Sequence, residues 1–218
     1  EYFQFVELLF GGLPGRGRGD GLDGHSWWPL FRTTPSEYAE SYYPVRVEAY
    51  TPVQDSGGPG LKRGGTGIEK TYAFTGSGTV SIADDRAIIA PWGINGGLHG
   101  GRSSKTLVRV DGTREALPSK VDGVQVSAGD VLIFRTAGAG GWGDPLERPA
   151  ELVALDLERG LISVDSAREA YGVIVDEGKV DTAATSKLRG ELASERGPAP
   201  DFDFGERPGV PTTQEVAA

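Results

Sequence analysis

The residues best suited to chemistry lie in one glycine-rich stretch, residues 15–26. Asp20, Asp23, His25 and Ser26 occur close together there. Such a cluster can hold a cation through oxygen ligands, or it can orient an imidazole as a general base. The alternative is a turn in which aspartate and serine side chains bond backbone N–H groups while the histidine fills a gap. We take His25 and Asp20 as the candidate catalytic residues.

The scarcity of histidine and cysteine limits the metal sites and nucleophiles that this chain can build. Its 218 residues include two histidines and no cysteine. These counts exclude a metal site of several imidazoles, thiolate zinc sites, thiol nucleophiles and disulfides. We therefore predict no metal bound by this chain alone.

A second group of candidates surrounds Arg63, which precedes Gly64 and Gly65. Glycine N–H groups can converge on an anion, and Arg63 could clamp a carboxylate or phosphate. The sequence lacks the GxxxxGK[ST] phosphate-binding pattern, and the other glycine loop, residues 138–143, runs into an Asp-Pro pair that opposes anion binding. Tight turns and close approach of strands are thus the favoured explanation of the glycines, and a surface salt bridge is the alternative for Arg63.

Two large apolar residues, Trp27 and Trp28, follow the first cluster. They could wall a substrate cavity or seal a subunit interface. We favour the interface, because a chain without any methionine is expected to be part of a longer product. Absence of only the initiator methionine and a short leader is the alternative.

The elements that must position these residues are mostly short strands. Runs rich in β-formers are separated by turn signals with no helical pattern between them, which favours a sandwich or barrel over a parallel sheet. Helical patterns and a hairpin at Glu177-Gly178 follow the glycine loop of residues 136–145. The predicted class is α+β, with a β-rich body at residues 1–135, a glycine loop with helices and hairpin at 136–196, and an extended or partly disordered tail at 197–218. The expected strands include residues 1–10, 43–53, 79–83, 86–90, 106–110, 125–127 and 131–135, and the expected helices are 149–159, 165–171 and 182–196.

Charge and hydropathy exclude several classes of partner. Lysine and arginine number 22 against 31 acidic residues, a net charge of −9, and no basic run offers the phosphate-neutralising stripe of nucleic-acid binding. No run of about 18 apolar residues or signal-peptide layout occurs, so we expect neither a membrane span nor secretion. We predict a cytoplasmic protein, which the absence of cysteine also fits.

Five stretches of the sequence, in the same order as in the family, resemble the C-terminal part of the hydantoinase B/oxoprolinase family. They cover roughly residues 8–175. The resemblance carries over Asp20, Gly21, Gly24 and His25 as a DGxxGH element, and residues 63–67 as an RGGxG turn. The family usually continues with small polar residues after the histidine, whereas this chain is bulky and apolar there, which suits a more hydrophobic ligand or a tighter interface. The five stretches are GGLPGRGRGDGLDGHS, TPSEYAESYYPVRVEAY, DSGGPGLKRGGTGIEKTYAF, PWGINGGLHGG and FRTAGAGGWGDPLERPAELVALDLERGLISVDSAREAYGVIV.

The resemblance implies one component of an ATP-dependent enzyme that opens cyclic amides such as hydantoins, 5-oxoproline or lactams. It implies ATP and magnesium in a hydantoinase A-type partner subunit. It also implies a divalent metal, zinc or manganese, in the N-terminal part of the B-type component. A subunit of a ketone carboxylase and a non-catalytic scaffold are the alternatives, and His25, Asp20, Arg63, Gly64, Gly65, Trp27 and Trp28 are the site candidates.

Overall fold

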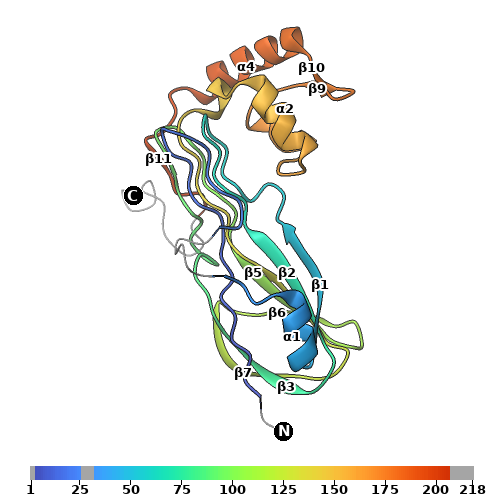
Figure 1. Cartoon of the computed structure of the whole chain (residues 1–218). Coiled ribbons are helices and arrows are strands. Elements are labelled where there is room, and N and C mark those ends of the chain that lie inside the picture. The colour runs from blue at the N-terminus through green and yellow to red at the C-terminus, as the bar shows by residue number, and fades with distance from the viewer. Residues whose placement is uncertain (1–2, 26–31, 207–218) are drawn as a thin grey trace, which may run out of the picture.

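Alternating side chains build a two-layer β-sandwich in the computed structural model, which describes residues 3–25 and 32–206 (Figure 1). The larger sheet is antiparallel with strand order β1-β2-β8-β5-β6, and the smaller sheet pairs β3 with β7. The larger sheet comprises β1 (Val45–Pro52), β2 (Ile68–Phe74), β8 (Val131–Arg135), β5 (Ser104–Val108) and β6 (Arg114–Ala116), and the smaller comprises β3 (Gly78–Ala83) and β7 (Lys120–Val126).

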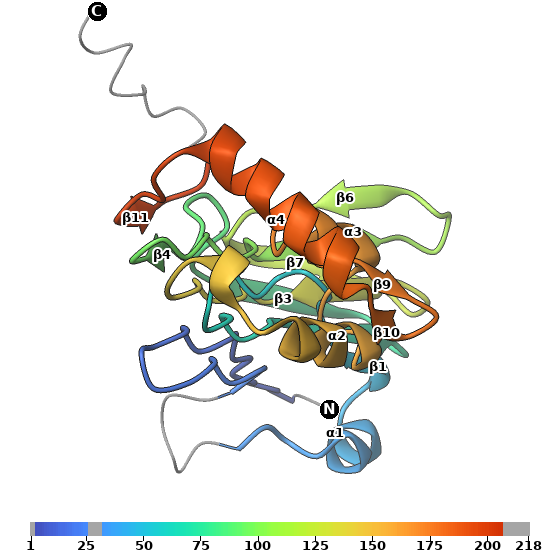
Figure 2. The ribbon, with the colours of Figure 1, turned by 90° about the horizontal axis from the view of Figure 1, so that it is seen from above.

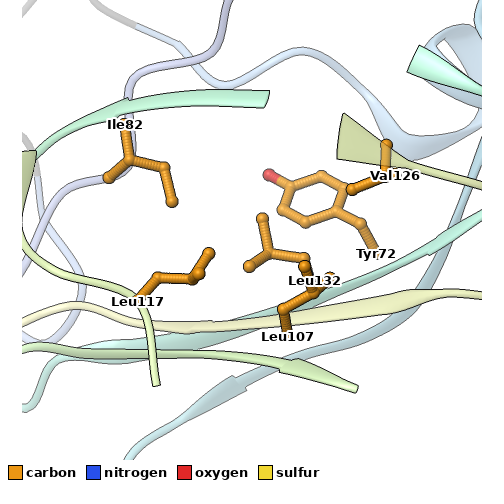
Figure 3. Packing of buried hydrophobic residues seen from close by; sticks show 6 residues of the cluster. All are labelled: Tyr72, Ile82, Leu107, Leu117, Val126 and Leu132. Carbon is orange, nitrogen blue, oxygen red and sulfur yellow. The ribbon is translucent and has the colours of Figure 1, made fainter. Parts of the chain in front are cut away.

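The core of the sandwich lies between the two sheets (Figure 3). Tyr72, Leu132 and Leu107 stand in register across three strands of the larger sheet. Ile82 and Val126 face them from the smaller sheet. Burying each of these side chains contributes about 1.5–3 kcal/mol.

Above the sandwich, long extended segments, mostly outside regular strands, form a glycine-rich array (Figure 1). The array consists of residues 11–17, 56–67, 93–101 and 136–143. The last segment is central, because its N–H groups bond neighbours on different sides. The amide of Ala139 donates to the carbonyl of Gly65 at 3.0 Å, and that of Gly141 donates to the carbonyl of Leu98 at 2.9 Å. Backbone bonds between segments therefore replace a sheet here.

Glycine is required in this array because the backbones are too close for a Cβ atom. A Cβ on Gly138 would lie 1.7 Å from the Ser56 carbonyl oxygen, and one on Gly140 would lie 1.6 Å from that of Trp92. Both distances are far below van der Waals contact. Close approach of segments thus explains why these positions are glycine.

The helical region follows the array and packs around its own core (Figure 2). Ser163 caps one helix by accepting from the Ser166 amide, and Asp181 caps another by accepting from the Ala184 amide. Glu177 and Gly178 both take positive φ, as the two-residue hairpin turn requires. The elements are the 3-10 helix η1 (Pro145–Glu147), α2 (Ala150–Glu158), α3 (Val164–Glu169), β9 (Val175–Asp176), β10 (Lys179–Val180) and α4 (Thr182–Arg196).

The chain then returns to the array. Strand β11 (Phe202–Asp203) pairs antiparallel with β4 (Gly93–Ile94). The carboxylate of Asp203 also accepts from the His99 amide at 2.8 Å. Residues 197–206 are therefore attached to the surface of the array.

The α+β class is confirmed, and several expected elements need correction. The expected strand at residues 86–90 does not form: residues 85–89 are bends, and Arg86 takes a left-handed φ of 64° that a strand does not allow. In the described part of the chain, residues 3–9 of the expected first strand are extended but belong to no assigned strand. Helix α1 (Ser36–Tyr42) was not expected, and no side chain caps its N-terminus. Among the described residues, no helix is long and apolar enough to cross a membrane.

We predict that Gly140→Ala destabilises the fold by about 3 kcal/mol or more, because the new methyl group meets a backbone carbonyl that cannot move alone. The free energy of unfolding in urea measures this. Gly190→Ala in α4 is the matched control, because nothing lies within 4 Å of its added Cβ. It should stabilise the helix by up to about 1 kcal/mol. Equal effects of the two substitutions would contradict the close-approach explanation.

Candidate functional site

Five charged side chains meet where the glycine array joins the helical region, and we call them the charge network. They are far apart in the sequence, so the fold itself brings them together. The first two lie in the loop before His25, the third lies in the array, the fourth ends η1, and the last lies on α2. These residues are Asp20, Asp23, Arg63, Arg148 and Asp156.

Arg148 is the centre of the network, and its side chain is only 1% exposed. Its two terminal nitrogens donate to the two carboxylate oxygens of Asp20 at 2.7 and 2.8 Å. Its Nη2 also donates to Asp156 Oδ2 at 2.8 Å. Arg148 thereby ties the loop of residues 18–25 to α2 through charge-assisted bonds.

Arg63 makes the second bidentate contact. Its Nη1 and Nη2 donate to Asp23 at 2.9 and 3.2 Å, and its Nε lies 3.5 Å from Asp156 Oδ1. The Arg63 amide donates to Asp20 Oδ1 at 2.9 Å. The Thr66 amide donates to Asp23 Oδ1 at 2.7 Å. The loop of residues 18–25 is thus held to the array by both side chains and backbone.

The protonation of the network follows from burial and from its arginines. Burial alone would raise the pKa of Asp20 and of Asp23, but the bonds and charges of Arg148 and Arg63 outweigh it and hold both pKa values below the usual range. Burial raises the pKa of Asp156 above its usual value despite both arginines. Three carboxylates against two guanidinium groups leave the ionised network with one net negative charge.

His25 lies at the surface end of this loop. Its amide donates to the Gly11 carbonyl at 3.0 Å, and its side chain is exposed. Asp20 and Asp23 both turn toward arginines, so neither carboxylate hydrogen-bonds the imidazole. The structure therefore brings Asp20 to Arg63, as partners in one network, and does not build a His25–Asp20 pair. Trp27 and Trp28 lie outside the described residues.

Gly64 and Gly65 have a clear role in packing. Their amides donate to the carbonyls of Gly58 and Leu13 at 2.9 and 2.8 Å. A Cβ on either residue would lie about 2.0 Å from a backbone oxygen. Their N–H groups therefore bond within the chain and do not converge on an open anion cradle. The Arg63 side chain is buried, with 4% exposed, whereas the side chain of its partner Asp23 is 33% exposed. Asp23 is therefore the more solvent-exposed member of this ion pair.

A shallow pocket of about 210 Å³ adjoins the network. Asp23 and Thr66 lie on its polar side, and Tyr50, Pro52 and Ile68 provide apolar walls. Within residues 3–25 and 32–206, no three side chains of histidine, cysteine, aspartate or glutamate gather to hold a metal ion. The three carboxylates of the network bind Arg63 and Arg148, and these contacts fix the loop of residues 18–25.

Sequence reasoning missed Arg148 and Asp156. Asp156 occupies the buried side of α2 together with Val153, three residues earlier. An acidic residue at that spacing on an apolar face is a signal for a buried cationic partner. The partner itself could not be found from local pattern, because Asp20 lies 128 residues from Arg148.

The comparison with known proteins gives the family. The hydantoinase B/oxoprolinase family model matches residues 1–145. The chain belongs to this family. A putative B-type subunit of a D-/L-hydantoinase from Pseudomonas sp. (strain NS671) is 33% identical over 192 residues, which are 86% of this chain and 32% of that protein.

Two solved structures share the fold. The ATP-dependent caprolactamase from Pseudomonas jessenii has a TM-score of 0.63 at 27% identity, over 84% of this chain and 33% of that chain. Acetone carboxylase has a TM-score of 0.61 at 20% identity, over 83% and 29% respectively. The chain spans about a third or less of the length of the curated relatives it matches.

We predict that Arg148→Met lowers the free energy of unfolding by about 3–5 kcal/mol, because it leaves Asp20 and Asp156 without their buried cation. Thermal and urea denaturation measure the loss. Arg46→Met is the control, since the Arg46–Glu48 pair is exposed on β1 and should contribute less than about 1 kcal/mol. Similar losses in both variants would show that burial does not set the strength of the network.

The lowered pKa of Asp20 predicts a pH dependence. A carboxylate whose folded pKa lies below its unfolded value stabilises the fold above the unfolded pKa, and this stabilisation is lost as pH falls through the folded pKa. Asp156, with a raised pKa, acts in the opposite direction. We expect stability to fall below about pH 4, and Asp20→Asn to flatten that fall. An unaltered acid profile in Asp20→Asn would contradict the assignment.

Proposed function

We propose that this chain is part of the B-type component of an ATP-dependent enzyme that opens cyclic amides by hydrolysis. The observation that supports this most strongly is the agreement of sequence and fold: a hydantoinase B-type relative at 33% identity and a caprolactamase at 27% with a TM-score of 0.63. The names of both proteins refer to cyclic amides. Acetone carboxylase resembles the chain in fold, so a ketone carboxylase component is the second candidate.

Within that enzyme, the chain presents the loop of residues 18–25 on a rigid base. The array and the charge network fix both ends of the loop, and His25 projects at its exposed end. We propose His25 as the catalytic residue, with its imidazole moving a proton to or from the amide or the attacking water. Asp20 then serves as a positioning residue, because both of its oxygens bind Arg148.

The partners in this proposal supply the remaining chemistry. A hydantoinase A-type subunit binds ATP with magnesium, and the N-terminal part of the B-type component holds the divalent metal, zinc or manganese. Transfer of a phosphoryl group from ATP to the amide oxygen would release ADP and make the amide carbon more electrophilic. Water could then add, the ring C–N bond could break with the nitrogen leaving as an amine, and the resulting acyl phosphate could be hydrolysed to carboxylate and phosphate, which is the reason for coupling to ATP. Trp27 and Trp28 are proposed to contact these partners, and the complex is proposed to be cytoplasmic. A scaffold role with all chemistry in other chains is the alternative that a test must separate.

Incubation of the assembled complex with ATP and hydantoin, 5-oxoproline or caprolactam should release phosphate in a substrate-dependent manner. Bicarbonate with acetone should not do so. Reversal of this pattern would favour the carboxylase, and no ATP consumption with either set would overturn the proposed reactions.

We predict that His25→Ala and His25→Asn lower turnover by about 100-fold or more, the usual contribution of a general acid or base, without altering assembly. Phosphate release and gel filtration measure these two properties. His99→Ala is the matched control, because it removes the other histidine and should keep turnover within about twofold. Full activity of the His25 variants in an intact complex would support the scaffold alternative.

A further inference from the structure

The N-terminal segment, residues 3–9, has an unused hydrogen-bonding edge. It is extended and lies along the sandwich, where Figure 1 shows it as a dark-blue trace. In the described part of the chain, its backbone N–H and C=O groups make no hydrogen bond with backbone or side chain. Extended backbone with free donors and acceptors is the template to which another strand adds.

The inner side of this segment is firmly held. The Glu7 side chain is 6% exposed and accepts from Lys70 Nζ at 2.7 Å, and it also accepts from the Tyr72 hydroxyl. Phe5 stacks on Tyr43 with ring centroids 4.7 Å apart, and Phe5 and Leu9 pack against the sandwich core. The segment is therefore an ordered part of the fold, whose unpaired edge has a fixed position.

The outer side carries no charge. Val6 and Leu8 are 70% and 51% exposed and lie beside the exposed Gln4, while Phe3, on the side of Phe5, is 43% exposed and contacts Tyr43. Val6 and Leu8 flank the inward Glu7, as the alternation of an extended chain requires. The exposed side chains of this segment carry no charge, since its one charged residue is paired inside.

Unlike residues 3–9, the two edge strands of the larger sheet, β1 and β6, are protected against pairing with another strand. Strand β1 carries the exposed Arg46–Glu48 pair, a register shift between Val47 and Ala49, and a terminal proline. Strand β6 is three residues long and exposes Arg114 and Glu115. Charges, bulges, prolines and short length are the devices that keep edges from pairing. Residues 3–9 have none of these devices on their outer side.

We propose that residues 3–9 pair through their unused backbone edge with an extended strand from the rest of the B-type component, and that the same component covers the outward side chains of Val6 and Leu8. The inference rests on the proposed function. The two solved neighbours match this fold over 33% or less of their own chains, so most of each of those chains lies outside the matched part. The ordered, uncharged and unpaired edge is the surface suited to that contact. Pairing between two copies of this chain is the rival occupant.

Hydrogen–deuterium exchange tests the pairing. In the isolated chain, the amides of residues 4–9 should exchange much faster than those of β8, which is paired on both sides. In the complex with the remainder of a family-length B-type component, exchange of residues 4–9 should slow at least 10-fold. Unchanged exchange in a formed complex would overturn the proposal. Protection already present in the isolated chain, and rising with its concentration, would overturn it in favour of self-pairing.

A pair of double variants tests the apolar contact. Val6→Lys with Leu8→Lys should weaken the Kd of the complex at least 10-fold while leaving the melting temperature of the isolated chain unchanged. Ile88→Lys with Ile89→Lys is the matched control, since these side chains are 61% and 46% exposed elsewhere, and it should leave the Kd unchanged. Equal Kd values for the two variants would contradict the proposed contact.

A stable, active complex without protection at residues 4–9 would refute the strand pairing alone, whereas failure of the wild-type chain to form any complex would refute the proposed function as well.

Discussion

Close approach of backbone to backbone is the constraint on which this structure depends. In the array, a carbonyl oxygen occupies the place where a side chain would begin, as at Gly138 and Gly140. Extended segments can then bond neighbours in several directions without forming a sheet. Such an array has little apolar surface of its own to bury. It is stabilised instead between a sandwich with a conventional core and a helical region with another.

The charge network joins the array, the loop of residues 18–25 and the helical region. Polar contacts help to fix the array relative to the helical region, as between Arg63 Nε and Asp156 Oδ1 at 3.5 Å. Two bidentate arginine contacts do so, and they fasten the loop that ends at His25 in the same interaction. Arg189 on α4 holds the backbone beside the network, because it donates to the carbonyls of Arg148 and Tyr171 at 2.6 and 3.0 Å. Stability of the fold and position of the loop are thus properties of one set of residues.

Local patterns predicted the elements whose determinants are local. Helix α4 has its expected limits because Asp181 caps it, and the hairpin of β9 and β10 forms where Glu177-Gly178 permits positive φ. Residues 86–90 have an apolar pattern suited to a strand, but the left-handed backbone at Arg86 depends on long-range contacts. The functional site shows the same division between local and long-range determinants. Asp20 and Arg63 were recognisable as unusual residues, whereas their association through Arg148 and Asp156 depends on tertiary structure.

The central claim is that this chain works as one portion of a larger B-type component. Native mass spectrometry of the complex purified from its natural source, with peptide mapping of each species, tests it most directly. We predict that the chain occurs in an assembly with an A-type polypeptide and with the remaining B-type sequence, whether that sequence is covalently joined to it or is a separate chain. A single species consisting of this chain alone, in a preparation that retains ATP-dependent amide hydrolysis, would contradict it.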